Sequence, residues 1–200
     1  MKQTAAFLLL ILLAGSLGCQ PQPSQMAKLG METLGLVIVT DMPDVEPLVT
    51  AYVQAKLPKV KIIGSQAVWT HLGGTADGET AAALENRENL TRLREDLAIE
   101  YLAVISIEKG ESPRHSTSIT VGTDKSEIRL RQYLTVDLNY TVIDTSSGEK
   151  IFTGRTQGRS SDIAGLKVGT EGTQVGIQLS RERSLLKEAV RDALRETGIF

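Results

Sequence analysis

The side chains with the widest chemical scope in this sequence are one cysteine and two histidines. Cys19 is the only cysteine, and His71 and His115 are the only histidines. A cysteine can act as a nucleophile, bind a metal or carry a lipid, but with no second cysteine it cannot form a disulfide within the chain. The two histidines fall in different predicted loops, so ordinary exposed histidines are favoured over a metal site built from both plus a carboxylate. The sequence therefore predicts no metal site.

Motifs for nucleophilic, phosphate and metal chemistry are missing from the sequence. It contains no G-x-S-x-G, no GxxxxGK and no H-E-x-x-H. The glycines of residues 158–176 do not lie between a strand and a helix start, so flexibility is favoured over an anion-binding nest. We therefore expect no catalytic residue, no cofactor and no enzymatic activity.

Cys19 directly follows a segment that has the three parts of a secretory signal. Residues 1–18 contain the positive charge of Lys2, an apolar run over residues 5–14 and small residues at the end. The apolar run is shorter than the roughly 20 residues that a transmembrane helix needs. We expect residues 1–18 to be removed as a signal peptide.

The residues at the predicted cleavage point resemble the lipobox of bacterial lipoproteins, in which cleavage exposes an N-terminal cysteine that is acylated. Gly18 and Cys19 match the most restrictive positions, whereas Ser16 and Leu17 depart from the usual residues. The alternative is an ordinary signal peptide that is cut nearby and leaves a free thiol, which would be reactive in an oxidising compartment. Lipidation of Cys19 is the favoured interpretation.

The lipobox resemblance also implies how and where the protein is held. It implies a diacylglyceryl group and an acyl chain such as palmitate on Cys19, which exceeds the two membrane signals needed for stable attachment. Gln20 is not the Asp that commonly retains lipoproteins at the inner membrane. In a Gram-negative cell, the resemblance therefore implies the periplasmic face of the outer membrane.

The remaining chain has the size and charge of one ordinary domain. Removing 18 of the 200 residues leaves 182, enough to bury a substantial core. The full chain has 22 Lys and Arg against 24 Asp and Glu, a formal charge of −2. This balance offers no basic field for nucleic acid and no polybasic patch for anionic lipid, so the expected contact with a membrane is the N-terminal lipid alone.

The hydrophobic pattern predicts a lipidated N-terminus and tether over residues 19–33 and one domain over residues 34–200. Continuous apolar runs predict strands covered on both faces, alternation predicts a long strand with one wet face, and amphipathic periodicity predicts helices. The expected strands are residues 34–40, 59–63, 101–108, 126–142 and 150–158; the expected helices are residues 45–57, 80–98 and 180–198, with Asp44 and Ser180 as N-caps; residues 158–179 are expected to be a flexible loop. This order predicts a mixed α/β (α+β) fold, with three main helices on a sheet of about five strands.

Two predicted loops contain the candidate partner-binding residues. The Gly-rich loop after the second strand carries Trp69, the only tryptophan, next to His71. An exposed Trp is a common interface anchor, but Trp69 could also simply close one end of the core. The polar insertion at residues 112–125 carries Arg114 and His115, and its alternative interpretation is a long hairpin tip.

Several stretches of the domain resemble a group of bacterial envelope lipoproteins. They are the apolar strand at residues 101–108, the strand end and turn in which Asp144 is followed by Gly148 and Glu149, and the closing amphipathic helix. The group includes the curli-export (CsgG-like), LpoB-like and TolB N-terminal-domain-like families. The resemblance implies the same mixed fold and action without catalysis.

Two functions follow from this resemblance. The favoured one is a lipid-anchored, non-enzymatic periplasmic protein that binds another envelope protein and positions or activates an envelope machine. The alternative is a subunit of an outer-membrane secretion or appendage pore or ring, as in curli export, and hence a homo-oligomer. Residues 112–125 are too polar for a membrane-inserted hairpin, and residues 158–179 have only a few spaced apolar side chains. The short tether indicates that the domain stays close to its membrane.

Overall fold

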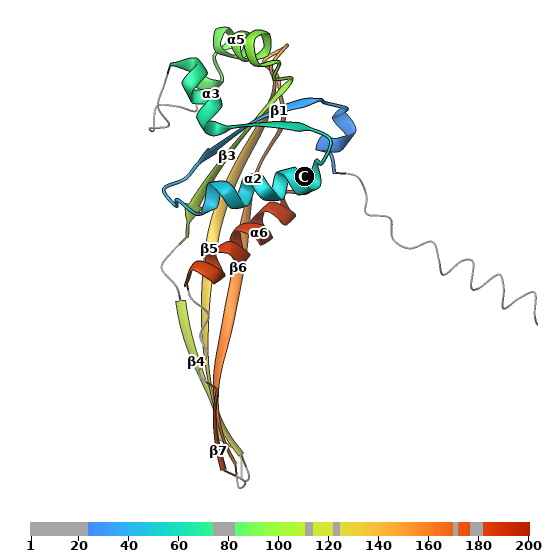
Figure 1. The fold of residues 1–200 in the computed structure, drawn as a ribbon. Helices are drawn as coiled ribbons and strands as arrows, with labels where there is room; N and C mark the ends of the chain where they lie inside the picture. Colours follow the sequence, from blue (N-terminus) through green and yellow to red (C-terminus); the bar gives the residue numbers. More distant parts are fainter. Residues whose placement is uncertain (1–23, 74–82, 111–113, 122–124, 170–171, 177–181) are drawn as a thin grey trace, which may run out of the picture.

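The computed structural model describes residues 24–73, 83–110, 114–121, 125–169, 172–176 and 182–200, which form one mixed sheet with helices on both faces (Figure 1). In chain order the elements are η1 (Met26–Leu29), β1 (Thr33–Val39), α2 (Val45–Lys56), β2 (Lys61–Gly64), α3 (Ser65–Leu72), α5 (Arg87–Leu97), β3 (Tyr101–Lys109), β4 (Arg114–Val121), β5 (Lys125–Asp144), β6 (Lys150–Gly169), β7 (Gly172–Gly176) and α6 (Glu182–Glu196). The predicted mixed α/β fold is confirmed.

The sheet has a parallel part and an antiparallel part. β1 pairs in parallel with β2 and β3, whereas β5 pairs antiparallel with β3, β4 and β6, and β6 pairs antiparallel with β7. The spatial order is β2-β1-β3-β5-β6-β7, with β4 also on β5. The described sheet has seven strands rather than about five, because residues 114–121 and 172–176 form two strands that the sequence did not predict.

Helices cover both faces of the parallel part. α2 and α6 enclose the larger core on one face, and α3 and α5 enclose a smaller core on the other. Along β1, Leu36 and Ile38 enter the larger core while Val37 enters the smaller one. A strand that is covered on both faces needs apolar side chains on both, which explains the nearly continuous apolar run at residues 34–40. Burial of each such side chain stabilises the folded state by about 1.5–3 kcal/mol.

α6 packs very closely on the antiparallel part of the sheet. Leu134, Val136 and Leu138 of β5 are fully buried on the side that faces α6. On β6, a Cβ added to Gly158 would lie 1.8 Å from the carbonyl oxygen of Ala189. Gly158 is therefore a packing position under α6 and not part of a flexible loop.

β5 and β6 are each 20 residues long and extend well beyond α6 (Figure 1). We call this extension the blade; it comprises β4, β7, residues 125–133 of β5 and residues 161–169 of β6. At about 3.4 Å per residue, residues 125–133 span roughly 30 Å. The prediction of a loop over residues 158–179 is wrong for the part that forms β6 and β7, while the polar insertion at 112–125 contributes β4, the hairpin partner of β5.

Part of the predicted tether belongs to the folded domain. Met26 in η1 is fully buried in the larger core, and its N–H donates to the carbonyl oxygen of Ile199 at 2.9 Å. Met31 enters the same core. Within the described residues the folded unit therefore extends back to residue 24 rather than beginning at residue 34, because two methionines fill the core from a segment with tether-like composition.

The helix boundaries also differ in places from those predicted. The loop expected after β2 is in part a helix, since α3 follows Gly64 directly and ends at Gly73, whose φ is 73°. α5 begins after Asn86, whose side chain accepts a hydrogen bond from the Glu88 N–H at 2.9 Å, rather than near Thr80, which lies outside the described residues. Asn is among the residues preferred at this capping position, so Asn86 is the start signal of α5.

The two predicted helix caps have different outcomes. α2 begins after Asp44, as predicted, but the Asp44 side chain makes no capping hydrogen bond and instead contacts Arg183 Nη2 at 2.5 Å. Ser180 lies outside the described residues. Among the helices that the structure describes, none is both long enough and apolar enough to cross a membrane.

Candidate functional site

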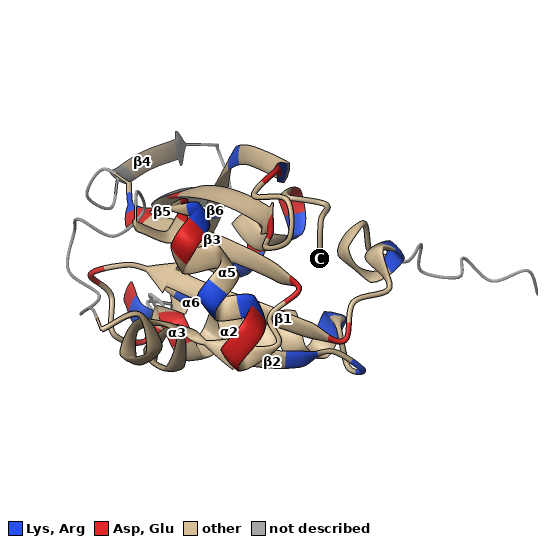
Figure 2. Cartoon of the chain, turned by 90° about the horizontal axis from the view of Figure 1, so that it is seen from above, with Lys and Arg blue, Asp and Glu red and all other residues tan. Residues whose placement is uncertain are grey.

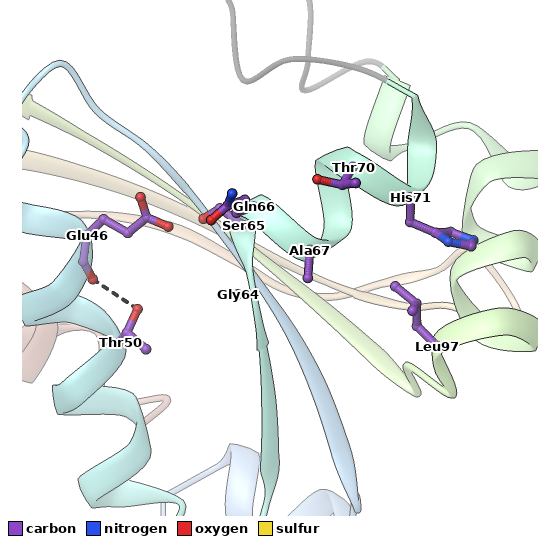
Figure 3. Close-up of a pocket in the computed structure, with 9 residues that line it drawn as sticks. All are labelled: Glu46, Thr50, Gly64, Ser65, Gln66, Ala67, Thr70, His71 and Leu97. Carbon is purple, nitrogen blue, oxygen red and sulfur yellow. Dashed lines mark hydrogen bonds between the residues drawn. The ribbon is translucent and has the colours of Figure 1, made fainter.

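An open cleft of about 850 Å³ lies between α2 and α3, at the end of β2 (Figure 3). The N-terminal half of α2 forms one wall, and α3 with the end of α5 forms the other. The residues that line it are Glu46, Thr50, Gly64, Ser65, Gln66, Ala67, Thr70, His71 and Leu97. An enclosed pocket buries most of a small ligand, whereas this open shape suits a segment of a larger partner.

The chain path explains the position of the cleft. β1 is followed by α2 on one face of the sheet, and β2 is followed by α3 on the opposite face. The two helices therefore separate at the carboxyl ends of neighbouring parallel strands. In open α/β sheets this is the place where ligands commonly bind.

Ser65 fixes the start of α3 to the sheet. Its hydroxyl accepts a hydrogen bond from the Ile38 N–H at 3.0 Å and donates to the Leu36 carbonyl oxygen at 3.4 Å. The residue is only 5% exposed. Because both contacts are to the backbone of β1, the inner end of the cleft is held in place by the core of the sheet.

His71 lies at the outer end of the cleft and joins α3 to α5. Its Nε2 lies 2.8 Å from Asp96 Oδ2, and Arg92 Nη2 donates to the His71 carbonyl oxygen at 3.3 Å. The His71 side chain is 25% exposed and that of Asp96 is 54% exposed. This partly exposed pair supports the rim of the cleft and leaves a polar edge in contact with solvent.

The polar groups of the cleft can make hydrogen bonds to a bound partner. Glu46, Gln66 and Thr70 offer a carboxylate, an amide and a hydroxyl along the two walls (Figure 3). The Thr50 hydroxyl donates to the Glu46 carbonyl oxygen at 2.9 Å. Within the described residues, the only side chain bonded to the His71 ring is Asp96, so the cleft lacks a nucleophile next to a base.

The resolved pKa shifts lie away from the cleft. Burial raises the pKa of the Tyr52 phenol, and the charge of Arg195 opposes this shift. A hydrogen bond from the Ser146 hydroxyl lowers the pKa of Asp144. A search of the described ranges for groups of three or more His, Cys, Asp or Glu side chains that could hold a metal found none.

The structure places the predicted site residues in three different settings. Trp69 is only 5% exposed and packs in the smaller core, which agrees with the alternative that it closes one end of the core, and it lies in α3 rather than in the expected loop. His71 lies on the rim of the cleft. Arg114 and His115 begin β4, where they pair with Tyr133 and Gln132, and β4 lies at the opposite end of the molecule from α3 (Figure 1). The structure therefore does not bring the two pairs together.

Cys19 and the signal segment lie outside the described residues. Lipidation of Cys19 and binding of a partner by the four candidate residues stay predictions.

Sequence reasoning missed most of the cleft. Glu46 and Gln66 come from two helices, and their only sequence signal is that they are polar positions beside the apolar stripes of those helices. The carboxyl ends of β1 and β2 were predictable, and the rule that ligands bind there could have pointed to residues 64–67.

Comparison with known proteins does not assign a family. No family model matches the chain, and no curated protein matches it. Among solved structures, the chain is similar to the lipoprotein GNA1162 from Neisseria meningitidis, with 14% identity and a TM-score of 0.39, over 82% of this chain and 98% of that one. The C-terminal domain of LpoB from Salmonella enterica matches at 12% identity and a TM-score of 0.33, over 66% of this chain and 91% of that one.

A third similar structure is the PelC dodecamer from Paraburkholderia phytofirmans, at 16% identity and a TM-score of 0.35, over 82% of this chain and 86% of that one. The similar structures thus include bacterial lipoproteins, the class that the residues around Cys19 predict. Because these TM-scores are below 0.5, we base no functional argument on them.

Proposed function

We propose that this chain is a lipid-anchored, non-enzymatic protein of the periplasmic face of the outer membrane that binds another envelope protein through the cleft between α2 and α3. In this role it positions or activates an envelope machine. The observation that carries the proposal is the open, polar-walled cleft between α2 and α3. The resemblance of Gly18 and Cys19 to a lipobox supports the lipid anchor.

The N-terminus supports an arrangement close to the membrane. If Cys19 is acylated, five Cα-to-Cα steps separate it from Ser24, the first described residue. A fully extended chain of that length reaches at most about 18 Å. Because the chain continues from there into the buried Met26, the domain has little freedom to move away from the bilayer.

The cleft supports protein binding in three ways. It is open, its wall of α3 and α5 carries the apolar side chains of Ala67 and Leu97, and it has polar groups along both walls (Figure 3). An apolar centre with a polar rim is the usual arrangement of a protein interface. Ser65 holds the inner end against the core, so little ordering is required when a partner binds.

Site-specific photocrosslinking of the full-length chain in its native host tests the cleft. A photoreactive residue at Gln66 or Thr70, both exposed on the cleft wall, should give one protein adduct of defined mass. Arg191, which is exposed on α6 away from the cleft, is the matched control position. The variant Ala67→Arg fills the cleft and should abolish the adduct without releasing the chain from the membrane.

Two results would contradict the cleft assignment. One is the same adduct from Gln66 and from Arg191. The other is an adduct from Gln66 that persists in Ala67→Arg, because a filled cleft should exclude the partner. Membrane release is measured separately with Cys19→Ser, so failure of the anchor and failure of the cleft can be told apart.

One observation favours a pore or ring subunit as a second candidate function. Ile119 of β4 is 65% exposed and lies directly opposite Ile128 of β5, which is 38% exposed. Leu166 and Val175 occupy the next two positions of the same row across β6 and β7. Two exposed apolar side chains directly opposite each other on neighbouring strands suit contact with lipid or with neighbouring copies better than contact with water.

The two functions predict different assemblies. A pore or ring predicts a large detergent-stable complex that conducts ions and that dissociates in the variant Ile119→Asp. A monomeric detergent-extracted chain whose membrane attachment depends on Cys19 alone would rule out this second function.

A further inference from the structure

The side of β5 and β6 that faces away from α6 is a broad polar surface. In both strands the even-numbered residues of this region face the larger core, as the buried Leu134 and Gly158 show. The odd-numbered residues 131–139 of β5 and 155–159 of β6 lie on the opposite side. Among the described elements, α3 and α5 cover this side only near β1 and β3, and no helix lies over these residues (Figure 1).

Three arginines of this surface are exposed. Arg155 has a side-chain exposure of 68%, and Arg131 and Arg159 are also exposed. We call the surface defined by Arg131, Tyr133, Arg155, Gln157 and Arg159 the arginine face. In Figure 2, blue basic segments occur on β5 and β6.

A chain of side-chain contacts organises one half of the arginine face. Arg159 Nη2 donates to Gln157 Oε1 at 3.2 Å, and Gln157 Nε2 donates to Asp137 Oδ1 at 3.3 Å. Arg155 Nη2 lies 3.2 Å from the same carboxylate oxygen. The Arg131 side chain makes no hydrogen bond or ion pair with any of the described residues. The arginines are therefore held at one surface but only partly neutralised.

The charge of this surface contrasts with that of the chain. The chain carries a formal charge of −2, yet the arginine face presents three arginines against Asp137 and the neighbouring Glu108 of β3. Arg155 and Arg159 are four residues apart on one strand, which is about 13 Å. Arg159 pairs with Thr135, and Arg131 lies a further four residues along β5, again about 13 Å. The positive charges thus follow a line of roughly 26 Å.

We infer that the arginine face binds a linear acidic polysaccharide. Guanidinium groups form paired hydrogen bonds with carboxylates, and their regular spacing along a strand suits a polymer with repeated charges. Gln157, Thr135 and Asn139 add hydrogen-bonding groups for hydroxyls, and Tyr133 adds a ring that a sugar can stack on.

The arrangement suits a glycan better than an acidic protein segment. Extended peptides bind by adding a strand to the edge of a sheet, and residues 155–159 of β6 do lie on an edge strand, because β7 pairs only with Gly165–Gly169 of β6. The arginine face, however, is the flat side of the strands and continues onto Arg131 and Tyr133 of β5, which lie away from that edge. Protein interfaces also place apolar or aromatic anchors at their centre, whereas the centre of this surface holds Gln157, Asp137 and two arginines. The inference does not depend on the cleft or on Cys19.

Binding of labelled polymers to the purified, detergent-extracted protein tests this inference. Polygalacturonate is the acidic polysaccharide probe, dextran is the neutral one, and poly-L-glutamate is the acidic polypeptide. We expect binding to polygalacturonate that weakens at high salt, with no binding to dextran and weaker binding to poly-L-glutamate.

The variants locate the binding to this surface. The double substitution Arg131→Gln with Arg159→Gln should weaken polygalacturonate binding by about tenfold or more, because two charge-assisted contacts are lost. The matched control is Arg191→Gln, which removes one exposed arginine from α6 and should leave the affinity unchanged. Equal melting temperatures of the variants would show that the fold is intact.

Four outcomes would overturn the inference. They are equal binding of dextran, stronger binding of poly-L-glutamate than of polygalacturonate, unchanged affinity in the double variant, and no binding of polygalacturonate at low salt. Stronger binding of poly-L-glutamate would indicate an acidic protein partner instead.

Discussion

Replacing Gly158 by alanine tests how α6 is held on the sheet. The new Cβ would lie 1.8 Å from the Ala189 carbonyl oxygen and 2.5 Å from the Ala193 backbone nitrogen. Ordinary contact distances for such pairs are about 3.5 Å, so α6 must move away from β6 by more than an ångström. Overpacking typically costs 1–3 kcal/mol, and because both clashing atoms belong to backbone that cannot change rotamer, we expect about 3 kcal/mol or more.

Thermal unfolding measures this change in the free energy of unfolding. For a domain of this size, about 3 kcal/mol corresponds to a decrease of roughly 6–12 °C in the melting temperature. The matched control is Gly64→Ala, since a Cβ at Gly64 has no atom within 4 Å and its φ is −75°. The control should melt within a degree or two of the unchanged chain. If Gly158→Ala melted with the control, the close packing of α6 on β6 would be wrong.

Two further predictions concern other parts of the domain. Trp69→Ala should lower the free energy of unfolding by about 3–5 kcal/mol, because it removes a buried ring from the smaller core. The control Gln66→Ala, on the exposed side of the same helix, should change it by less than about 0.5 kcal/mol. Chemical denaturation measures both values. The Ser146 hydroxyl lowers the pKa of Asp144, so the stabilisation from this group is complete above its usual pKa of about 3.8 and is lost as the pH falls through the lower folded-state pKa. Melting temperatures measured from neutral pH to below pH 4 should therefore fall less steeply in Asp144→Asn, and an unchanged acid dependence would contradict the role of this turn.

The sequence was most informative where hydrophobic pattern and burial agree. The strands at residues 34–40 and 101–108 were predictable because both their faces are covered, which leaves a continuous apolar run. The alternation of apolar and polar residues from Ser126 to Val142 correctly predicted a long strand and its buried side, which includes Leu134 and Leu138. These elements set the order of the fold and hence its mixed class.

The sequence was least informative where small side chains replace the usual signals. Residues 158–169 form a strand by pairing with the backbone of β5. Their glycines interrupt the alternation of apolar and polar side chains that would otherwise predict a strand. Gly158 is required by the close approach of α6, which no local pattern shows. The helix that carries Trp69 is short and contains weak helix formers, so its tertiary contacts and not its propensity determine it.

Only part of the candidate site could be predicted from the sequence, because its two walls come from different helices. The sequence marks His71 only as a polar residue beside the single tryptophan, and the structure places it on the rim of the cleft. The opposite wall, with Glu46, comes from a different helix and becomes a neighbour of Gln66 only when α2 and α3 leave opposite faces of the sheet. Such a site depends on topology more than on a motif.

We propose that a lipid on Cys19 holds the chain at the membrane. The most direct test is the intact mass and membrane partition of the mature protein from its native host, compared with Cys19→Ser. We expect a mature chain that begins at Cys19, carries the mass of the acyl groups and stays with the membrane after a high-salt wash, while Cys19→Ser is released as a folded protein. A mature chain without acyl mass, or a Cys19→Ser variant that remains on the membrane after the wash, would show that a lipid on Cys19 is not the anchor.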